Sequence, residues 1–413
     1  MKLKKYKLGD LCTFVNGRAY LQPELQNYGK YKIVRVGNLS GGNNSWYYSD
    51  MELEPTKYCA KGDLLYAWAC NFGPYIWKGD KTIYHYHIWK VINSEQIDKM
   101  YLYYLLKFMT NSFMGCVHGS TMLHITKENM ESMEVRIHAS IEEQRRIATI
   151  LNKLDCKIEL NRQINDNLEA MAKQLYDYWF VQFDFPNEEG KPYKSSGGAM
   201  VYNERLKREI PVGWQVENLV DFAEIKNGAT PSTSDDTNYG GDIVWITPKD
   251  LSDQQSKFVY RGERNITKQG FDSCSTSMLP INSLLMSSRA PIGLISIAKH
   301  EVCTNQGFKS FIPKNMKDSI YLYYYIKHHI KQIEQLGTGT TFKEVSRDDL
   351  CKFPILVVGA NDTYKLWVEL QDEIANKQFV LTKEIASLTK QRDELLPLLM
   401  NGQASVNYHL SAC

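Results

Sequence analysis

Apolar residues recur at every seventh position along two stretches of the chain, which is the spacing of the a and d positions in a coiled coil. The first stretch has one mostly apolar row and a second row placed three positions later. These rows comprise Ile147, Leu154, Asn161, Leu168 and Leu175, and Ile150, Lys157, Ile164, Met171 and Tyr178. The pattern predicts one long helix with Asn161 and Lys157 as polar interruptions.

The first predicted helix is longer than a small domain needs. Ser140 and Glu143 form a Ser-x-x-Glu capping box at its start, and no proline follows until Pro186. About 39 residues at 1.5 Å each span roughly 58 Å, which exceeds the width of a small domain. We therefore expect the helix to extend beyond its own domain, with simple packing on that domain as the alternative.

A second stretch near the end of the chain repeats the spacing. Its first row is wholly apolar, and the row three positions later is weaker. The two rows comprise Trp367, Ile374, Leu381, Leu388 and Leu395, and Leu370, Lys377, Glu384, Gln391 and Leu398. Pro397 should end or kink this second helix near its last turn.

The remaining segments contain short β-rich runs such as YKIVRV, DIVWIT and LCKFPILVV, separated by Asn-Gly and other glycine-rich turns. They occur in two copies. Residues 101–121 begin with YLYY, and residues 321–341 begin with the same letters 220 positions later. The offset relates residues 62–180 to 282–400, and LCTFVNG (11–17) resembles LVDFAEIKNG (219–228) more loosely. A period this long indicates a duplicated domain.

These patterns predict an α+β fold of two similar globular domains and two long helices. The expected segments are residues 1–138 and 214–357 for the domains, 139–181 and 358–401 for the helices, 182–213 for a connector, and 402–413 for a C-terminal tail. If the helices pair as an antiparallel coiled coil, the chain gains a pseudo-twofold axis. That symmetry suits a ligand with two reading sites, either double-stranded DNA, whose half-sites lie about 34–36 Å apart, or a pair of protein subunits.

Composition narrows the function classes. A net charge of +2 over 413 residues neither implies nor excludes a nucleic-acid partner. We expect no membrane span, because no apolar run of about 18 residues occurs. We also expect no signal peptide, because the start MKLKKYKLGDLC lacks the apolar region of one. Nine cysteines without a Cys-x-x-Cys pair favour a cytoplasmic chain with reduced thiols. His85 and His87 lack the further ligands that a metal site needs.

Several polar residues are candidates for DNA contacts. The turns that follow the tyrosine-rich runs could offer N–H and hydroxyl groups to phosphates. Arg289 could read guanine, and Asn305 with Gln306 could read adenine or support a buried turn. Ordinary surface charges and loops are the alternatives. The candidates are Arg18, His118, Ser120, Thr121, Lys249, Ser288, Arg289, Thr338, Thr340, Thr341, Lys343 and Arg347.

Longer motifs carry a family resemblance. IEEQRRIATILNKLD (141–155) enters the first long helix, FDFPNEEGKPYKSSGGAMV (183–201) forms the connector, and IPVGW (210–214) opens the second copy. NQGF (305–308) and GTGTTFKEVSRDDLCKFPI (337–355) follow. With the duplicated architecture, the chain resembles the specificity subunits of type I restriction-modification systems over nearly its whole length. It departs from their pattern at residues 85–88 and lacks a clear Glu-Gln motif at the second long helix.

The resemblance implies a division of labour among subunits. Each domain would be a target-recognition domain for one half of a split sequence on double-stranded DNA, and the chain would have no catalytic activity. The helices would separate the halves and bind two methyltransferase subunits, to which restriction subunits with motor and endonuclease activity are added. S-adenosylmethionine, ATP and Mg²⁺ would belong to these partners. The helix residues assigned to partner binding are Ile147, Leu154, Leu168, Leu175, Ile374, Leu388 and Leu395.

Two other function classes remain as alternatives. One is a coiled-coil scaffold that links protein partners without binding DNA. The other is an enzyme, because NFGPY (71–75) nearly spells the Asn-Pro-Pro-Tyr motif of amino-methyltransferases. Gly73 replaces a proline of that motif, however, and neither a methyl-donor loop nor a Gly-x-x-x-x-Gly-Lys-Ser/Thr phosphate loop is present. A steep fall of DNA affinity with salt would separate a DNA-binding subunit from a scaffold.

Overall fold

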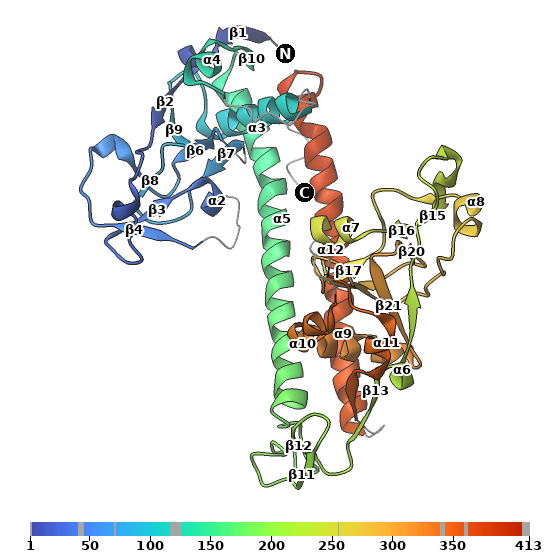
Figure 1. The fold of residues 1–413 in the computed structure, drawn as a ribbon. Helices are drawn as coiled ribbons and strands as arrows, with labels where there is room; N and C mark the ends of the chain where they lie inside the picture. Colours follow the sequence, from blue (N-terminus) through green and yellow to red (C-terminus); the bar gives the residue numbers. More distant parts are fainter. Residues whose placement is uncertain are drawn as a thin grey trace. The chain divides into compact units, whose positions relative to one another are not determined.

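The computed structural model describes residues 2–39, 45–69, 72–115, 125–254, 256–338, 343–358 and 362–406. The chain forms two compact units, Met1–Leu160 with Ile385–Cys413, and Asn161–Glu384 (Figure 1). Each unit contains one α+β domain together with a part of both long helices. The mixed helix and sheet content agrees with the predicted fold class.

Both predicted long helices are present. Helix α5 comprises Ile141–Tyr176 and continues as a π-helical turn over Asp177–Val181. Helix α12 comprises Asp362–Met400, so it ends soon after Pro397. Among the described residues, no helix is long and apolar enough to cross a membrane.

The first predicted heptad row of each helix is buried or half-buried, but in the second predicted row only Ile150, Ile164 and Glu384 are half-buried. Lys157, Met171 and Leu370 of that row are exposed. The second inward row lies four residues after the first, and not three. Its members are Leu151, Ile158, Asn165, Ala172 and Trp179 along α5 and its π-helical turn, and Gln371, Gln378, Ile385, Arg392 and Leu399 along α12. In a heptad repeat the spacing between inward positions alternates between three and four residues. Because this row contains several polar residues, an apolar pattern in the sequence does not identify it.

The two helices pair antiparallel inside each unit. In the unit Asn161–Glu384, the Nε2 atom of Gln371 donates to the carbonyl oxygen of Ala172 at 3.0 Å, and the Nδ2 atom of Asn165 donates to Oγ1 of Thr382 at 3.4 Å. The residue numbers fall along α5 as they rise along α12. The same order holds in the other unit, where Asp155 pairs with Arg392 at 2.8 Å.

The first domain has two four-stranded sheets and a strand pair. The first sheet, in spatial order, contains β2 (Cys12–Asn16), β9 (Ile88–Asn93), β6 (Leu64–Ala67) and β7 (Gly73–Ile76), all antiparallel. The second contains β4 (Tyr47–Ser49), β3 (Tyr31–Val34), β8 (Thr82–Tyr84) and β5 (Tyr58–Cys59). Strand β1 (Leu3–Lys7) pairs with β10 (Glu134–His138). The helices are α1 (Leu8–Leu11), α2 (Val36–Leu39), α3 (Lys99–Gly115) and α4 (Lys127–Ser132).

The second domain has a five-stranded sheet. In spatial order it contains β14 (Ala223–Asn227), β21 (Phe308–Pro313), β18 (Leu284–Ser287), β19 (Ile295–Ala298) and β17 (Phe258–Val259). Smaller pairs are β16 (Trp245–Ile246) with β20 (Cys303–Thr304), and β13 (Gln215–Asn218) with β22 (Pro354–Val357). The remaining strand is β15 (Tyr239–Ile243). The helices are α6 (Leu219–Phe222), α7 (Pro248–Gln254), α8 (Lys268–Asp272), α9 (Ser319–His328), α10 (Ile330–Leu336) and α11 (Arg347–Lys352).

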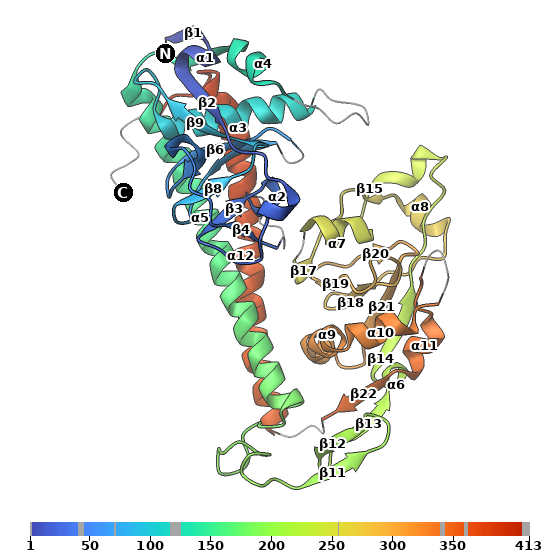
Figure 2. The ribbon, with the colours of Figure 1, turned by 60° about the vertical axis from the view of Figure 1, so that its left-hand side comes forward.

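The structure confirms the duplication. The constant offset that relates Tyr101 to Tyr321 also relates the first residues of β6 and β18, of β9 and β21, and of α4 and α11. The parallel pairing of Ile33 with Ile83 recurs as well, as Trp245 with Cys303. Helix α9 packs beside the five-stranded sheet (Figure 2).

The repeated tyrosines are core residues. Tyr101 and Tyr104 of α3, and Tyr321 and Tyr324 of α9, are almost completely buried. Each phenol needs a hydrogen-bond partner at such depth, and the hydroxyl of Tyr321 donates to the carbonyl oxygen of Leu356 at 2.5 Å. Burial of large rings with satisfied hydroxyls explains why tyrosine recurs in both copies.

The connector after α5 is folded. Strands β11 (Met200–Asn203) and β12 (Arg208–Pro211) form a hairpin, and Phe183 and Phe185 are buried in the core of the unit Asn161–Glu384. The aromatic residues of the connector therefore belong to the core of this unit.

Candidate nucleic-acid interface

Three loops of the second domain emerge from one end of the five-stranded sheet. Asn227, the last residue of β14, pairs with Lys309 near the start of β21, and Ser287, the last residue of β18, pairs with Phe308. The loops that follow β14 and β18 and the loop that precedes β21 therefore lie together. A fourth segment joins them, because the N–H of Val345 donates to the carbonyl oxygen of Ser288 at 3.0 Å. We call these four segments the second loop cluster.

Arg289 lies at the centre of the second loop cluster and is half-exposed. Its Nε atom donates to Oε2 of Glu344 at 2.9 Å, and the Nζ atom of Lys309 lies 3.2 Å from Oε1 of the same carboxylate. Burial opposes ionisation of Glu344, but Lys309 and Arg289 outweigh it and lower the pKa of that carboxyl. Glu344 thus orients the guanidinium of Arg289 through Nε, which leaves the two Nη groups available. An arginine in this state can present both Nη groups to a guanine edge or a phosphate.

The other candidates of this domain differ in accessibility. Thr338 and Lys343 are exposed, and the backbone of Thr338 pairs with that of Glu344, next to Arg289. Ser288 is buried, and its hydroxyl donates to the carbonyl oxygen of Gly307 at 3.3 Å, so its side chain supports the loop from beneath.

Arg347 and Lys249 already have protein partners. The Nε atom of Arg347 donates to the carbonyl oxygen of Ile225 at 2.9 Å. Lys249 forms an exposed ion pair with Glu263 at 2.8 Å, the kind of pair that contributes little to stability and exchanges easily for another anion.

Asn305 and Gln306 support the loops of the cluster through hydrogen bonds. The Oδ1 atom of Asn305 accepts from the N–H of Gly307 at 3.0 Å, and Gln306 is hydrogen-bonded through Oε1 to the hydroxyl of Thr230. A Cβ atom at Gly228 would lie only 2.0 Å from the carbonyl oxygen of Asn305, so only glycine fits there.

An equivalent loop cluster occurs in the first domain. Gly17 after β2 approaches the carbonyl oxygen of His85, where a Cβ atom would lie at 2.4 Å, as Gly228 approaches Asn305 in the second domain. His85 and Asn305 occupy the same position in the two copies of the repeat. The same close passage of two loops therefore recurs at the same end of both sheets. We call the loops after β2 and β6 and before β9 the first loop cluster.

The first loop cluster is rich in aromatic rings. Trp68 contacts the rings of Tyr86 and His87, and its Nε1 atom donates to the carbonyl oxygen of Tyr86 at 2.8 Å. Burial, with His87 and Arg35 as weaker causes, lowers the pKa of His85 to about 4, so this imidazole is neutral at neutral pH. Among the described residues, no group of three or more His, Cys, Asp or Glu side chains could hold a metal ion.

Arg18 also belongs to the first loop cluster. Its guanidinium forms a bidentate ion pair with Glu24, in which Nη2 donates to Oε1 at 2.7 Å and Nη1 donates to Oε2 at 3.1 Å. The guanidinium also lies over the ring of Tyr20. A phosphate would have to compete with Glu24 for this arginine. The remaining turn candidates lie outside the described residues; they are His118, Ser120, Thr121, Thr340 and Thr341.

The helix residues assigned to partner binding face into the chain. Ile147 and Leu388 are buried, and the others are half-buried; these are Leu154, Leu168, Leu175, Ile374 and Leu395. A separate subunit would contact other faces of the helices. Leu160, Met171 and Val380 each expose more than half of their surface there.

Two carboxylates of α5 connect the long helices to the domains, and the sequence analysis does not identify them. In the first unit, Asp155 accepts a hydrogen bond from the hydroxyl of Tyr104 at 2.8 Å and pairs with Arg392 of α12. In the second unit, Glu169 accepts from the hydroxyl of Tyr324 at 3.0 Å. Tyr104 and Tyr324 occupy the same position in the two copies of the repeat, so this repeated tyrosine was the signal in the sequence that could have led to the two carboxylates.

Glu169 also binds two lysines. Lys327 lies 2.9 Å away and Lys257 lies 3.3 Å away. Burial is the largest influence on Lys257 and lowers its pKa to about 8, although Glu169 acts in the opposite direction. Burial also opposes ionisation of Glu169, but the two lysines together lower its pKa. This buried network fixes the second domain on both helices, because Gln378 of α12 donates to Glu169 at 3.3 Å.

Comparison with known proteins identifies one family. The profile described as type I restriction modification DNA specificity domain matches residues 2–170 and 211–397, which are the two copies of the repeat. The MjaIX type I restriction enzyme specificity subunit of Methanocaldococcus jannaschii is 39% identical over 175 residues, which cover 41% of this chain and 40% of that protein. The HindI specificity subunit of Haemophilus influenzae is 25% identical, with 97% of this chain and 99% of that protein covered.

A solved structure shares the fold. The crystal structure of a type I restriction-modification system S subunit from M. genitalium superposes with a TM-score of 0.61 and 15% identity, and 96% of each chain is covered. At this identity the similarity concerns the fold alone.

Proposed function

This chain belongs to the family of type I restriction modification DNA specificity domains, and from that premise we propose that it selects a two-part target on double-stranded DNA without catalysing a reaction itself. The observation that carries the proposal is the duplicated loop cluster. Both clusters lie at the same end of repeat-related sheets, and their exposed residues differ between the copies. Two copies of one scaffold with different loops suit two different half-sites.

Each loop cluster offers a different chemistry. The second presents Arg289, oriented by Glu344, beside the exposed Thr338 and Lys343. An oriented arginine favours guanine in the major groove, and exposed lysine and threonine favour phosphates. The first presents Arg18 with the rings of Trp68 and Tyr86, and these two rings can contact sugars and thymine methyl groups. Each half-site would thus be read by one domain.

The long helices would bind the other subunits of the complex. The proposed contact surface is formed by the exposed apolar residues of these helices, which are Met171, Leu366, Leu370 and Val380 in the unit Asn161–Glu384, and Leu160 and Leu398 in the other unit. We assign two methyltransferase subunits to this surface, and restriction subunits join through them. S-adenosylmethionine, ATP and Mg²⁺ would be bound by those subunits.

The test is DNA binding by the assembled methyltransferase complex over a salt series. We expect the logarithm of the affinity to fall linearly with the logarithm of salt concentration, because phosphate contacts release counterions. The complex should also prefer one duplex over scrambled sequences of equal length. Binding that is insensitive to both salt and sequence would favour the scaffold alternative. Methyl transfer by the purified chain alone would contradict the non-catalytic role.

A further inference from the structure

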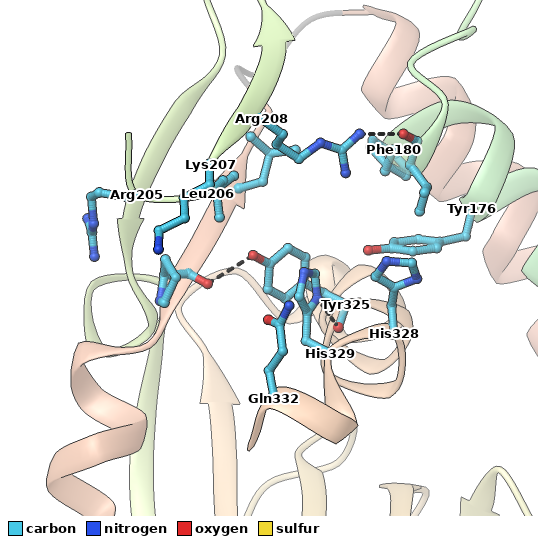
Figure 3. Close-up of a pocket in the computed structure, with 13 residues that line it drawn as sticks. Tyr176, Phe180, Arg205, Leu206, Lys207, Arg208, Tyr325, His328, His329 and Gln332 are labelled. Carbon is cyan, nitrogen blue, oxygen red and sulfur yellow. Dashed lines mark hydrogen bonds between the residues drawn. The ribbon is translucent and has the colours of Figure 1, made fainter. Parts of the chain in front are cut away.

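A cavity of about 290 Å³ lies in the unit Asn161–Glu384, and none of its lining residues belongs to a loop cluster. Figure 3 shows the side chains that line it. Its floor contains the buried rings of Tyr176, Phe180 and Tyr325. Its walls come from the end of α5, the turn before β12, helices α9 and α10, and strand β22. The turn supplies the cationic side chains of Arg205 and Lys207, and the first residue of β12 supplies that of Arg208.

The cations of this cavity have no carboxylate partner among the residues that the structure describes. Arg205 donates to the carbonyl oxygen of Val216 and to Oδ1 of Asn218. Arg208 donates to the carbonyl oxygen of Val181 at 2.5 Å and lies over the ring of Phe183. These partners are neutral, and no carboxylate among the described residues lines the cavity.

Lys207 is held in an unusual conformation at the mouth of the cavity. Its φ angle of 50° lies in the left-handed region, which side chains other than glycine rarely adopt. The preceding turn is fixed because Oδ1 of Asn203 accepts hydrogen bonds from the N–H groups of Arg205 and Leu206. In Figure 3, Lys207 and Arg208 lie across the opening from His328, His329 and Gln332.

Burial has depressed the basicity of the groups around this cavity. It lowers the pKa of Arg208, and it lowers the pKa of His329 to about 4. The pKa of His328 is also lowered, chiefly by burial, although Asp177 opposes the shift and is itself paired with Lys173. Charged forms are disfavoured here chiefly because burial removes water from these groups, and a bound anion would oppose that effect.

The first unit supplies an internal control for this cavity. A pocket of about 410 Å³ lies at the repeat-related position, lined by Leu105, Phe108 and Met109 where the second unit has Tyr325, His328 and His329. Met400 and Asn401 of the first unit likewise occupy the positions of Phe180 and Val181. The fold therefore tolerates apolar side chains there, so the polar set is not a requirement of packing.

We propose that the cavity between β12, α9 and the end of α5 binds a small oxyanion of the phosphate class, either free inorganic phosphate or pyrophosphate or the phosphate groups of a nucleotide. Arg208 and Lys207 would neutralise its charge, and His328 and Gln332 would donate hydrogen bonds to it, while the Nδ1 atom of His329 is already bound to the carbonyl oxygen of Tyr325. An anion bound there would link the connector hairpin to the second domain. The site is independent of DNA recognition, because none of its residues belongs to a loop cluster.

The experiment measures thermal unfolding and calorimetric binding of the full chain with pyrophosphate, at ionic strength held constant with sodium chloride. We expect a saturable rise in the unfolding temperature, since a ligand that binds only the folded state stabilises it. Lys207→Ala should weaken binding at least tenfold. The Lys314→Ala variant, at an exposed lysine of the same unit outside the cavity and both loop clusters, is the matched control and should bind pyrophosphate as the wild type does.

A second variant separates anion binding from folding. The double substitution His328→Phe and His329→Met introduces the residues of the first unit, which the fold accommodates, and it should also abolish the stabilisation. ATP binding tighter than pyrophosphate, lost in the same variants, would support a nucleotide; equal binding would support the free anion. A linear, unsaturable response of the wild type, or an equal loss in Lys314→Ala, would overturn the proposal.

Discussion

Replacing Glu169 with glutamine removes the carboxylate that binds Lys257 and Lys327 while keeping the size of the side chain. The cost through Lys257 can be worked from its pKa. At pH 7, a lysine with a pKa of about 8 is more stable protonated than neutral by about 1.4 kcal/mol. Without Glu169, Lys257 would lose its proton and become neutral. The destabilisation that arises through Lys257 is therefore limited to the same amount, about 1.4 kcal/mol.

The other partners of Glu169 add smaller amounts. Lys327 is partly exposed, and pairs of that kind contribute about 0–1 kcal/mol. The hydrogen bond from Tyr324 contributes about 1 kcal/mol, part of which the glutamine retains. We therefore expect Glu169→Gln to lower the free energy of unfolding at pH 7 by about 2–3 kcal/mol.

The pH dependence identifies the cause. The pKa of Lys257 is lowered to about 8 in the folded protein, whereas it is about 10.5 in the unfolded chain. Between these two pH values the unfolded chain binds more protons than the folded protein does. The free energy of unfolding of the wild type therefore gains with rising pH across this range. In the variant that gain begins at lower pH. The difference between the two proteins should therefore shrink by about 1.4 kcal/mol from pH 7 to pH 9.

Urea unfolding followed by circular dichroism at both pH values measures this difference. Exposed Glu369→Gln on α12 is the matched control and should change stability by less than about 0.5 kcal/mol. In a Lys257→Met background, the pH-dependent part of the Glu169→Gln effect should vanish. An effect of equal size at pH 7 and pH 9 in the wild-type background would refute this reasoning.

Two further predictions concern single residues. Arg289→Ala should weaken target binding by about 1–3 kcal/mol and relax one base position of the second half-site, as measured by binding to a library of substituted duplexes; a uniform loss across all sequences would make Arg289 a phosphate contact. Asn161→Leu should raise the free energy of unfolding by about 1–2 kcal/mol, because Asn161 is buried and its Nδ2 atom has no hydrogen-bond partner in the described part of the chain. Calorimetry checks this, and a lower unfolding temperature would show that the amide has a structural role.

Much of the fold follows from local patterns in the sequence. The constant offset between the two copies locates equivalent strands and helices in both domains without any alignment to other proteins. The first heptad row is readable because Ile147, Leu154 and Leu388 are apolar. The second row is not readable, because it includes Gln371 and Gln378, whose amides hydrogen-bond to α5 across the helix pair. Such partners become visible only when the two helices are side by side.

The candidate site is less predictable than the fold. Arg289 is correctly placed in an exposed loop, but its partner Glu344 is 55 residues away in the sequence. Ser288, the adjacent residue, is buried because it supports the loop against Gly307. Neighbouring residues of a loop thus have different roles, and the choice between them depends on long-range contacts that no short motif encodes.

The central claim is that each domain selects one half of the DNA target. The most direct measurement exchanges residues 214–357 for the matching segment of a relative with a different target and maps the methylated sites in cells that also carry the methyltransferase subunits. The account predicts that one half-site changes to that of the relative while the other half-site is retained. A change in both half-sites, or in neither, would contradict it.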